Sequence, residues 1–199
     1  MLFFTQARLV WEPLSPQELE ALRRAVRPEP QQEMAFHGSE GVLSSRWSWI
    51  ASKLFPGVLL ADVKINERDV TLAIDSGVTT EEPILLYAST VRAVDLRLTS
   101  MSDPIPFPRP GFEFNTYIFQ GVAESLEVGG LVLSHVPVRV VAAHHRLKAL
   151  GLPLFSLDGF LGISFLERFV ATWDLEAHRL YLRRGPWEGP APALPLHKA

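Results

Sequence analysis

The sequence predicts an all-β fold, a barrel or sandwich with a few short helices and a helix near the N-terminus. Short apolar runs rich in β-branched residues recur along the chain, and turn-forming residues separate them, which is typical of all-β domains. The 199 residues are 47% hydrophobic and 21% charged, a composition and size that can form a buried core in one domain with extensions. No internal repeat of useful period is present.

Charge and composition exclude several classes of function. The 19 basic and 22 acidic residues leave a net charge of −3, whereas a nucleic-acid partner would require a basic surface. The chain has no cysteine, which excludes disulfides, thiolate zinc sites, Fe–S clusters and cysteine nucleophiles. No apolar run reaches the roughly 18 residues of a membrane span, and the first residues do not resemble a signal peptide. We therefore expect a cytoplasmic protein without nucleic-acid or membrane partners.

The N-terminal region should contain one strand and one helix. Residues 2–11 are rich in β-forming side chains. Ser15 is a good N-cap, proline follows it at the first helical position, and Glu18 completes a capping box. The helix is expected to end before Pro28, and residues 28–46 are polar and read as irregular.

A β-hairpin is expected next. Residues 58–65 and 69–74 are apolar runs of strand length, and Asn66 begins a turn between them. The second strand of this hairpin continues directly into Asp75-Ser76-Gly77. A short helix or turn should follow over 86–95.

The remaining elements are mostly strands. The prolines between Pro104 and Pro110 alternate, so this stretch should be an extended edge or polyproline-like loop, because proline lacks the amide of a central strand. The other expected elements are strands at 114–128, 131–133 and 136–141 around a Gly129-Gly130 turn, one or two helical turns at 144–150, a short helix at 163–169, and a hairpin of 170–174 with 179–182.

Asp75-Ser76-Gly77 is the candidate catalytic loop. An acid at the end of an apolar strand costs several kcal/mol to bury unless it is paired or hydrogen-bonded. In a functional interpretation Asp75 is a catalytic carboxylate, Ser76 braces the loop through its hydroxyl, and Gly77 allows backbone amides to approach the carboxylate. A simple turn that closes a hairpin has the same residue types, and the tripeptide alone favours that interpretation.

A second motif favours the catalytic interpretation over the simple turn. Phe160-Leu161-Gly162 places two apolar residues before a glycine and a short amphipathic segment. Together with Ala73-Ile74-Asp75-Ser76-Gly77, it resembles the hallmark of the retropepsin-like single-domain aspartic peptidases. The resemblance covers roughly residues 58–183, and it includes a hairpin leading to the acid and a later strand pair with a Gly-Gly turn.

The resemblance implies a closed antiparallel barrel of the retropepsin type and an aspartic endopeptidase that acts on peptide or protein substrates. In that family two such carboxylates face each other across a two-fold axis and share one proton, because two close acids cannot both ionise. They activate a water molecule without a metal or other cofactor. Phe160, Leu161 and Gly162 would support the Asp75 loop from behind.

This sequence contains a single such loop. Asp158 is followed directly by glycine, and Asp103 and Asp174 also lack the pattern. The resemblance therefore implies a homodimer in which each chain supplies Asp75. Two residues depart from the commonest family pattern, Ser76 for threonine and Val78 for alanine, and the substrate-covering flap should lie within 101–116.

We divide the chain into an N-terminal extension (1–56), a peptidase domain (57–184) and a Pro-rich tail (185–199). Two non-catalytic alternatives remain open, an inactive retropepsin-like binding or dimerisation module and an accessory domain that docks a partner through the tail. His144-His145 has no acid or histidine at useful helical spacing, so no metal site is expected. Ser164 lacks the second glycine of a nucleophile elbow, which disfavours serine hydrolysis.

Overall fold

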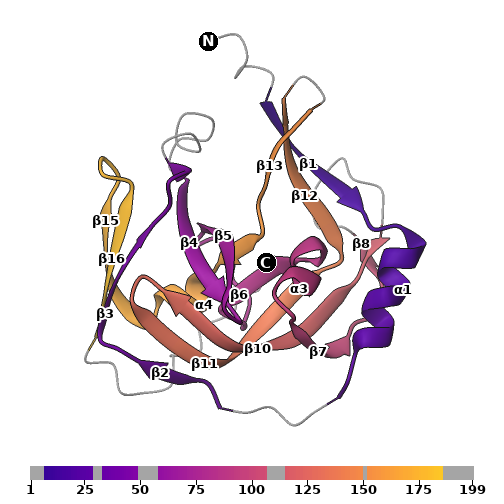
Figure 1. Ribbon diagram of the computed structural model, residues 1–199, viewed down its shortest axis with the longest axis horizontal. Coiled ribbons are helices and arrows are strands. Elements are labelled where there is room, and N and C mark those ends of the chain that lie inside the picture. The colour runs from indigo at the N-terminus through magenta and orange to yellow at the C-terminus, as the bar shows by residue number, and fades with distance from the viewer. Residues whose placement is uncertain (1–6, 29–32, 49–57, 107–114, 150–151, 186–199) are drawn as a thin grey trace, which may run out of the picture.

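The protein is described here by a computed structural model that covers residues 7–28, 33–48, 58–106, 115–149 and 152–185 (Figure 1). Six strands form a closed barrel in the order β11-β6-β14-β5-β4-β10, and β10 pairs back to β11 to close it. Their bounds are β4 (Leu59–Ile65), β5 (Arg68–Ile74), β6 (Ile84–Tyr87), β10 (Ile118–Val128), β11 (Leu131–Val141) and β14 (Gly159–Leu161).

The barrel is mixed rather than antiparallel. β14 runs parallel to β5, and β6 runs parallel to β11, while the other four neighbouring pairs are antiparallel. The prediction of an antiparallel barrel is therefore wrong for these two pairs. The reason is that β14, from late in the chain, lies between β5 and β6. The connection from β5 to β6 must cross over β14, and this crossover carries Asp75.

Two tight turns set the register of the barrel hairpins. Asn66 and Glu67 have φ values of 49° and 65° and join β4 to β5, as expected for a two-residue turn that matches the strand twist. Gly129 and Gly130 have φ values of 58° and 93° and join β10 to β11. Both predicted hairpins are confirmed, and the predicted strands at 131–133 and 136–141 merge into one continuous β11.

The core fills the inside of the barrel. Along β10 and β11 buried residues largely alternate with more exposed ones, because successive side chains of a strand point to opposite faces. Each fully buried Leu, Ile or Phe contributes about 1.5–3 kcal/mol relative to exposure. The largest fully buried apolar side chains include Leu59, Ile65, Leu72, Ile84, Leu86, Phe119, Leu126 and Phe165.

Two further sheets and two single strands extend the barrel. The first is a sheet of β1 (Ala7–Pro13), β12 (Ala143–Ala149) and β13 (Leu152–Ser156), and the second a sheet of β15 (Phe169–Asp174), β16 (Arg179–Arg184) and β3 (Glu40–Ser44). β2 (Ala35–His37) pairs with β11, and β7 (Arg97–Met101) pairs with β10. Figure 1 shows the first two sheets rising on opposite sides of the barrel.

Two sequence-based expectations are wrong in these added strands. Residues 28–46 were expected to be irregular, yet β2 and β3 form there because β11 and β16 offer them hydrogen-bonding edges. Residues 144–150 were expected to be helical, yet β12 is a strand because β1 and β13 pair with it on both sides. In both regions distant pairing overrides the local signal.

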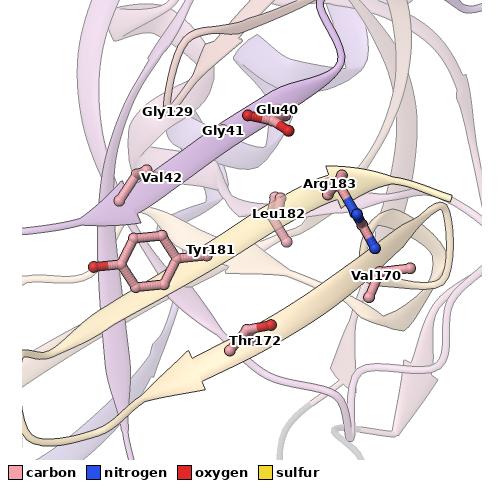
Figure 2. Close-up of a pocket in the computed structure, with 9 residues that line it drawn as sticks. All are labelled: Glu40, Gly41, Val42, Gly129, Val170, Thr172, Tyr181, Leu182 and Arg183. Atoms are coloured by element: carbon pink, nitrogen blue, oxygen red, sulfur yellow. The ribbon is translucent and has the colours of Figure 1, made fainter.

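The outer face of the β15-β16-β3 sheet carries a hollow of about 400 Å³. Figure 2 shows Tyr181 between Val42 and Thr172, and the strand register places these residues as direct cross-strand neighbours. Val42 and Tyr181 are exposed. Glu40 and Arg183, two positions further along the strands, are the next cross-strand pair on the same face of the sheet. This hollow does not include the residues of the candidate catalytic loop.

Helix α1 (Pro16–Ala25) has the predicted capping box, in which the Ser15 hydroxyl accepts from the Glu18 amide and the Glu18 carboxylate accepts from the Ser15 amide. The Glu18 carboxylate also accepts from the Ser15 hydroxyl at 2.7 Å, and this bond, followed by the one from the Ser15 amide, is the main cause of a lowered pKa of Glu18. A lowered folded-state pKa stabilises the protein above the unfolded pKa, and that contribution is lost as the pH falls through the folded pKa. Leu22 is buried against the core, and the Arg27 amide donates to Leu98.

Two shorter helices, α3 (Ala88–Ala93) and α4 (Ile163–Leu166), follow β6 and β14. β8 (Ile105–Pro106) and β9 (Asn115–Thr116) form a small ribbon where the flap was expected, and residues 107–114 between them lie outside the described part, as does the tail from 186. Among the described residues no helix has the length and apolarity needed to cross a membrane.

Candidate active site

Asp75 stands at the point where β5 ends. Its backbone amide donates to the Leu161 carbonyl at 3.1 Å, which extends the β5–β14 pairing by one residue. Its side-chain Oδ1 accepts from the Gly77 amide at 2.8 Å, and its carbonyl accepts from the Val78 amide at 3.2 Å. The carboxylate is therefore held by its own loop, and its position relative to β14 is set by a barrel hydrogen bond.

Gly77 leaves room for this carboxylate. A Cβ at position 77 would lie 3.0 Å from Asp75 Oδ1, closer than ordinary van der Waals contact. Any side chain at this position would require the carboxylate to shift by a few tenths of an ångström. The geometry therefore gives a physical reason for glycine two residues after Asp75.

Phe160, Leu161 and Gly162 lie directly beside the Asp75 loop. β14 pairs Leu161 with Ile74 and Phe160 with Ala73, and Leu161 is fully buried. Phe160 is half-buried and meets the Tyr87 ring edge to face, with the ring centroids 6.0 Å apart. The structure thus brings together the two motifs that the sequence analysis singled out, although Phe160, at the start of the second, lies 85 positions after Asp75 in the sequence.

Gly162 allows the loop to approach helix α4. A Cβ at this position would lie 2.7 Å from the Val78 carbonyl oxygen. Without it, the Ile163 amide donates to that carbonyl at 3.0 Å, and the Gly162 amide donates to Pro83 at 3.0 Å. The Ser164 hydroxyl also donates to the Thr80 carbonyl. The chain from Val78 to Pro83 is therefore tied to the start of α4.

The tip of the loop is exposed above an apolar floor. Asp75, Ser76 and Gly77 are exposed, whereas Ile74 and Leu161 beneath them are 6% and 0% exposed. Within the part of the chain that the structure describes, the Ser76 hydroxyl has no hydrogen-bond partner. The role of Ser76 as a brace therefore stays a prediction that needs a partner from outside these residues.

Asp158 cannot supply a second carboxylate to this site. It precedes β14, and its oxygens accept from the Thr71 amide at 2.9 Å and the Thr90 hydroxyl at 3.0 Å. Because β14 and β5 are parallel, Asp158 and Asp75 lie at opposite ends of the strand pair, separated by about four residues or roughly 13 Å. Asp158 connects β5 to α3 instead.

The described residues contain no cluster of three or more His, Cys, Asp or Glu side chains that could hold a metal ion. His144 pairs with Glu18 at 3.2 Å rather than with a group of ligands. The chemistry available at the loop is that of a carboxylate with one fixed oxygen, Oδ1, and an exposed surface around it.

Sequence reasoning missed one residue of this region. Glu82 lies seven residues after Asp75 and is buried in an ion pair with Arg139 of β11. Its neighbours in the sequence, two threonines and a second glutamate, gave it the character of an exposed loop. A glutamate placed directly before a proline and an apolar strand was the available signal, and it is a weak one.

Comparisons with known proteins give one structural likeness. No family model matches the sequence, and no curated protein matches it. The fold is similar to that of a retropepsin-like aspartic protease from Rickettsia conorii. The two chains are 16% identical, the match covers 77% of this chain and 95% of that chain, and the TM-score is 0.43.

Proposed function

We propose that this protein is an aspartic endopeptidase that hydrolyses peptide bonds as a homodimer, with Asp75 from each chain at the two-fold axis. The observation that supports it best is the placement of Asp75. Its carboxylate stands at the end of a barrel strand, held by the Gly77 amide and supported by Leu161 and Gly162, and its surroundings are exposed.

A single carboxylate of this kind is not sufficient for the chemistry. Hydrolysis needs one group to accept a proton from water and another to donate a proton to the scissile carbonyl. Two carboxylates that lie within hydrogen-bond distance can do both, because close like charges make them share one proton. Asp158 is engaged at the far end of β14, so the second carboxylate is assigned to another copy of the chain.

In the proposed reaction, a water molecule lies between the two Asp75 side chains. The ionised carboxylate takes a proton from the water, whose oxygen attacks the carbonyl carbon. The protonated carboxyl gives its proton to the carbonyl oxygen, and collapse of the tetrahedral intermediate passes a proton to the leaving amine. Ser76 is assigned as the residue whose hydroxyl braces the Asp75 loop, and Gly77 as the residue that lets the backbone amide reach the carboxylate.

Activity is expected to depend on dimer formation. Sedimentation velocity at micromolar chain concentration should show dimers, and a pepstatin-like transition-state mimic should shift remaining monomers into dimers by mass action. Specific activity on a mixed peptide library should fall as the enzyme is diluted below its dimer dissociation constant. A chain that stays monomeric with the mimic and cleaves peptides at undiminished specific activity would contradict the proposal. A stable dimer without cleavage would favour the binding-module alternative.

A further inference from the structure

Glu82 is the one charged side chain that is buried among the described residues, with 7% of its surface exposed. Arg139 of β11 donates to it through Nε at 2.8 Å and through an Nη2 atom at 3.3 Å, one bond to each carboxylate oxygen. Gln120 of β10 adds a third bond from its amide nitrogen at 3.3 Å. The carboxylate is thus oriented by two strands of the barrel.

The segment that carries Glu82 is the crossover that begins at Asp75. On one side it is bound to the first residues of α4 and to their N-cap through the carbonyls of Val78, Thr80 and Pro83. The Thr80 hydroxyl also donates to the Glu82 carbonyl at 2.8 Å, which closes the segment on itself. On its other side, the side chain of Glu82 binds it to β10 and β11. The crossover is therefore held on both sides, and we call the bonds of Glu82 with Arg139 and Gln120 the clamp.

This clamp continues to the base of the β8–β9 ribbon. Gln120 is the cross-strand neighbour of both Arg139 and Ser100, and its side-chain oxygen accepts from the Ser100 hydroxyl at 2.8 Å. Two residues further along the chain, the Ser102 amide donates to the Ile118 carbonyl where the ribbon begins. A continuous set of hydrogen bonds thus runs from the Asp75 crossover to the strands that carry the ribbon.

We propose that Glu82, through Arg139 and Gln120, is a positioning residue that fixes the Asp75 crossover relative to the base of the β8–β9 ribbon. This inference rests on the proposed peptidase function. Glu82 does not touch the carboxylate of Asp75, so it acts by orienting the backbone that bears it. Orientation matters because displacing a reacting group by about 1 Å can lower a rate by about a hundredfold.

The orienting effect of the Glu82–Arg139 ion pair can be tested separately from its effect on stability. Removing one partner of a buried pair is strongly destabilising because it leaves an unpaired charge, whereas replacing both partners by apolar residues of similar size is often neutral. The double variant Glu82→Met with Arg139→Met should therefore keep the melting temperature near that of the wild type. It removes the directional hydrogen bonds while retaining the packing.

We expect this double variant to show a kcat lowered about tenfold or more with KM within about twofold. Amide hydrogen exchange in peptides that span 75–83 should quicken about tenfold, while exchange in β4 and β5 stays unchanged. Gln120→Met changes an exposed position, so it should also lower kcat without lowering the melting temperature. This variant tests the inference if the double variant does not fold. Glu127→Gln, which breaks the exposed pair with Lys64, is the control and should change neither readout.

The outcomes distinguish this inference from the proposed function. Unchanged exchange over 75–83 in a folded double variant, or in Gln120→Met if only that variant folds, would overturn the positioning role whether or not the protein is a peptidase. Faster exchange with an unchanged kcat would overturn its relevance to catalysis. If the wild type cleaves no peptide, the proposed function fails, and the exchange measurement alone decides whether Glu82 holds the crossover.

Discussion

Asp75→Asn should lower kcat/KM for peptide cleavage by about a thousandfold or more, within the roughly hundredfold to ten-thousandfold that general acid–base catalysis contributes. Asparagine cannot accept the proton of the attacking water, and two asparagines at the two-fold axis could not share a proton. The variant is otherwise conservative, because its amide oxygen can still accept from the Gly77 amide. Initial rates on a peptide that the wild type cleaves would measure the effect.

The fold and the dimer should survive this change, because Asp75 is exposed and supports no packing. Melting curves and sedimentation should match those of the wild type. Asp158→Asn is the matched control. It weakens one of the hydrogen bonds that connect β5 to α3, which should cost about 1 kcal/mol, and it should leave the turnover of the folded enzyme intact. An Asp75→Asn variant that still cleaves at the wild-type rate would refute the assigned role.

Gly162→Ala should damage the candidate site through its support. The added Cβ would meet the Val78 carbonyl oxygen at 2.7 Å, and because this contact is with backbone, relief requires the crossover or α4 to move. Overpacking of this kind costs about 1–3 kcal/mol in the free energy of unfolding, which urea denaturation would measure. Displacement of the Asp75 loop should also lower kcat by about tenfold or more.

Gly41→Ala provides the comparison for this variant. Its Cβ, on β3, would also be crowded, by the Leu131 side chain of β11 at 3.0 Å and by the Gly129 carbonyl oxygen at 3.1 Å, and neither belongs to the crossover or to α4. It should lower stability without changing the kcat of the folded enzyme. If Gly162→Ala folds with wild-type kcat, Gly162 supports only the barrel and has no influence on the Asp75 loop.

Local patterns predicted the barrel hairpins well. The β4–β5 and β10–β11 pairs have apolar strands of sufficient length and short turns at Asn66 and Gly129, so nearest neighbours along the chain are also neighbours in space. Helix α1 likewise begins at its own N-cap, Ser15. These elements depend on interactions within a few residues, which a single sequence contains.

Elements that depend on distant partners were not predictable in this way. β3 is a short strand whose partner, β16, begins at Arg179, and β12 is flanked by β1 and β13 although its own residues indicated helical turns. The two parallel pairs of the barrel arise because β14 lies between β5 and β6, a placement that no local pattern encodes.

In the candidate site, too, some features could be predicted from local patterns and others depend on distant partners. The order of the two motifs predicted that Asp75 and Gly162 would be related, and the β5–β14 pairing brings them together. Glu82 and Arg139 are 57 residues apart, and the proline and apolar strand that follow Glu82 are only a weak local signal of its burial. The division of the chain at residues 57 and 184 stays a prediction. In the structure β1, β2 and β3 pair with β12, β11 and β16, so strands on both sides of residue 57 share sheets.

The stoichiometry of ligand binding tests the central claim most directly, because a site built from two Asp75 residues can exist only once for every two chains. Isothermal titration of the wild-type protein with a pepstatin-like mimic should saturate at one ligand per two chains, and Asp75→Asn should bind it far more weakly. Saturation at one ligand per chain would contradict the account, because each chain would then hold a complete site of its own.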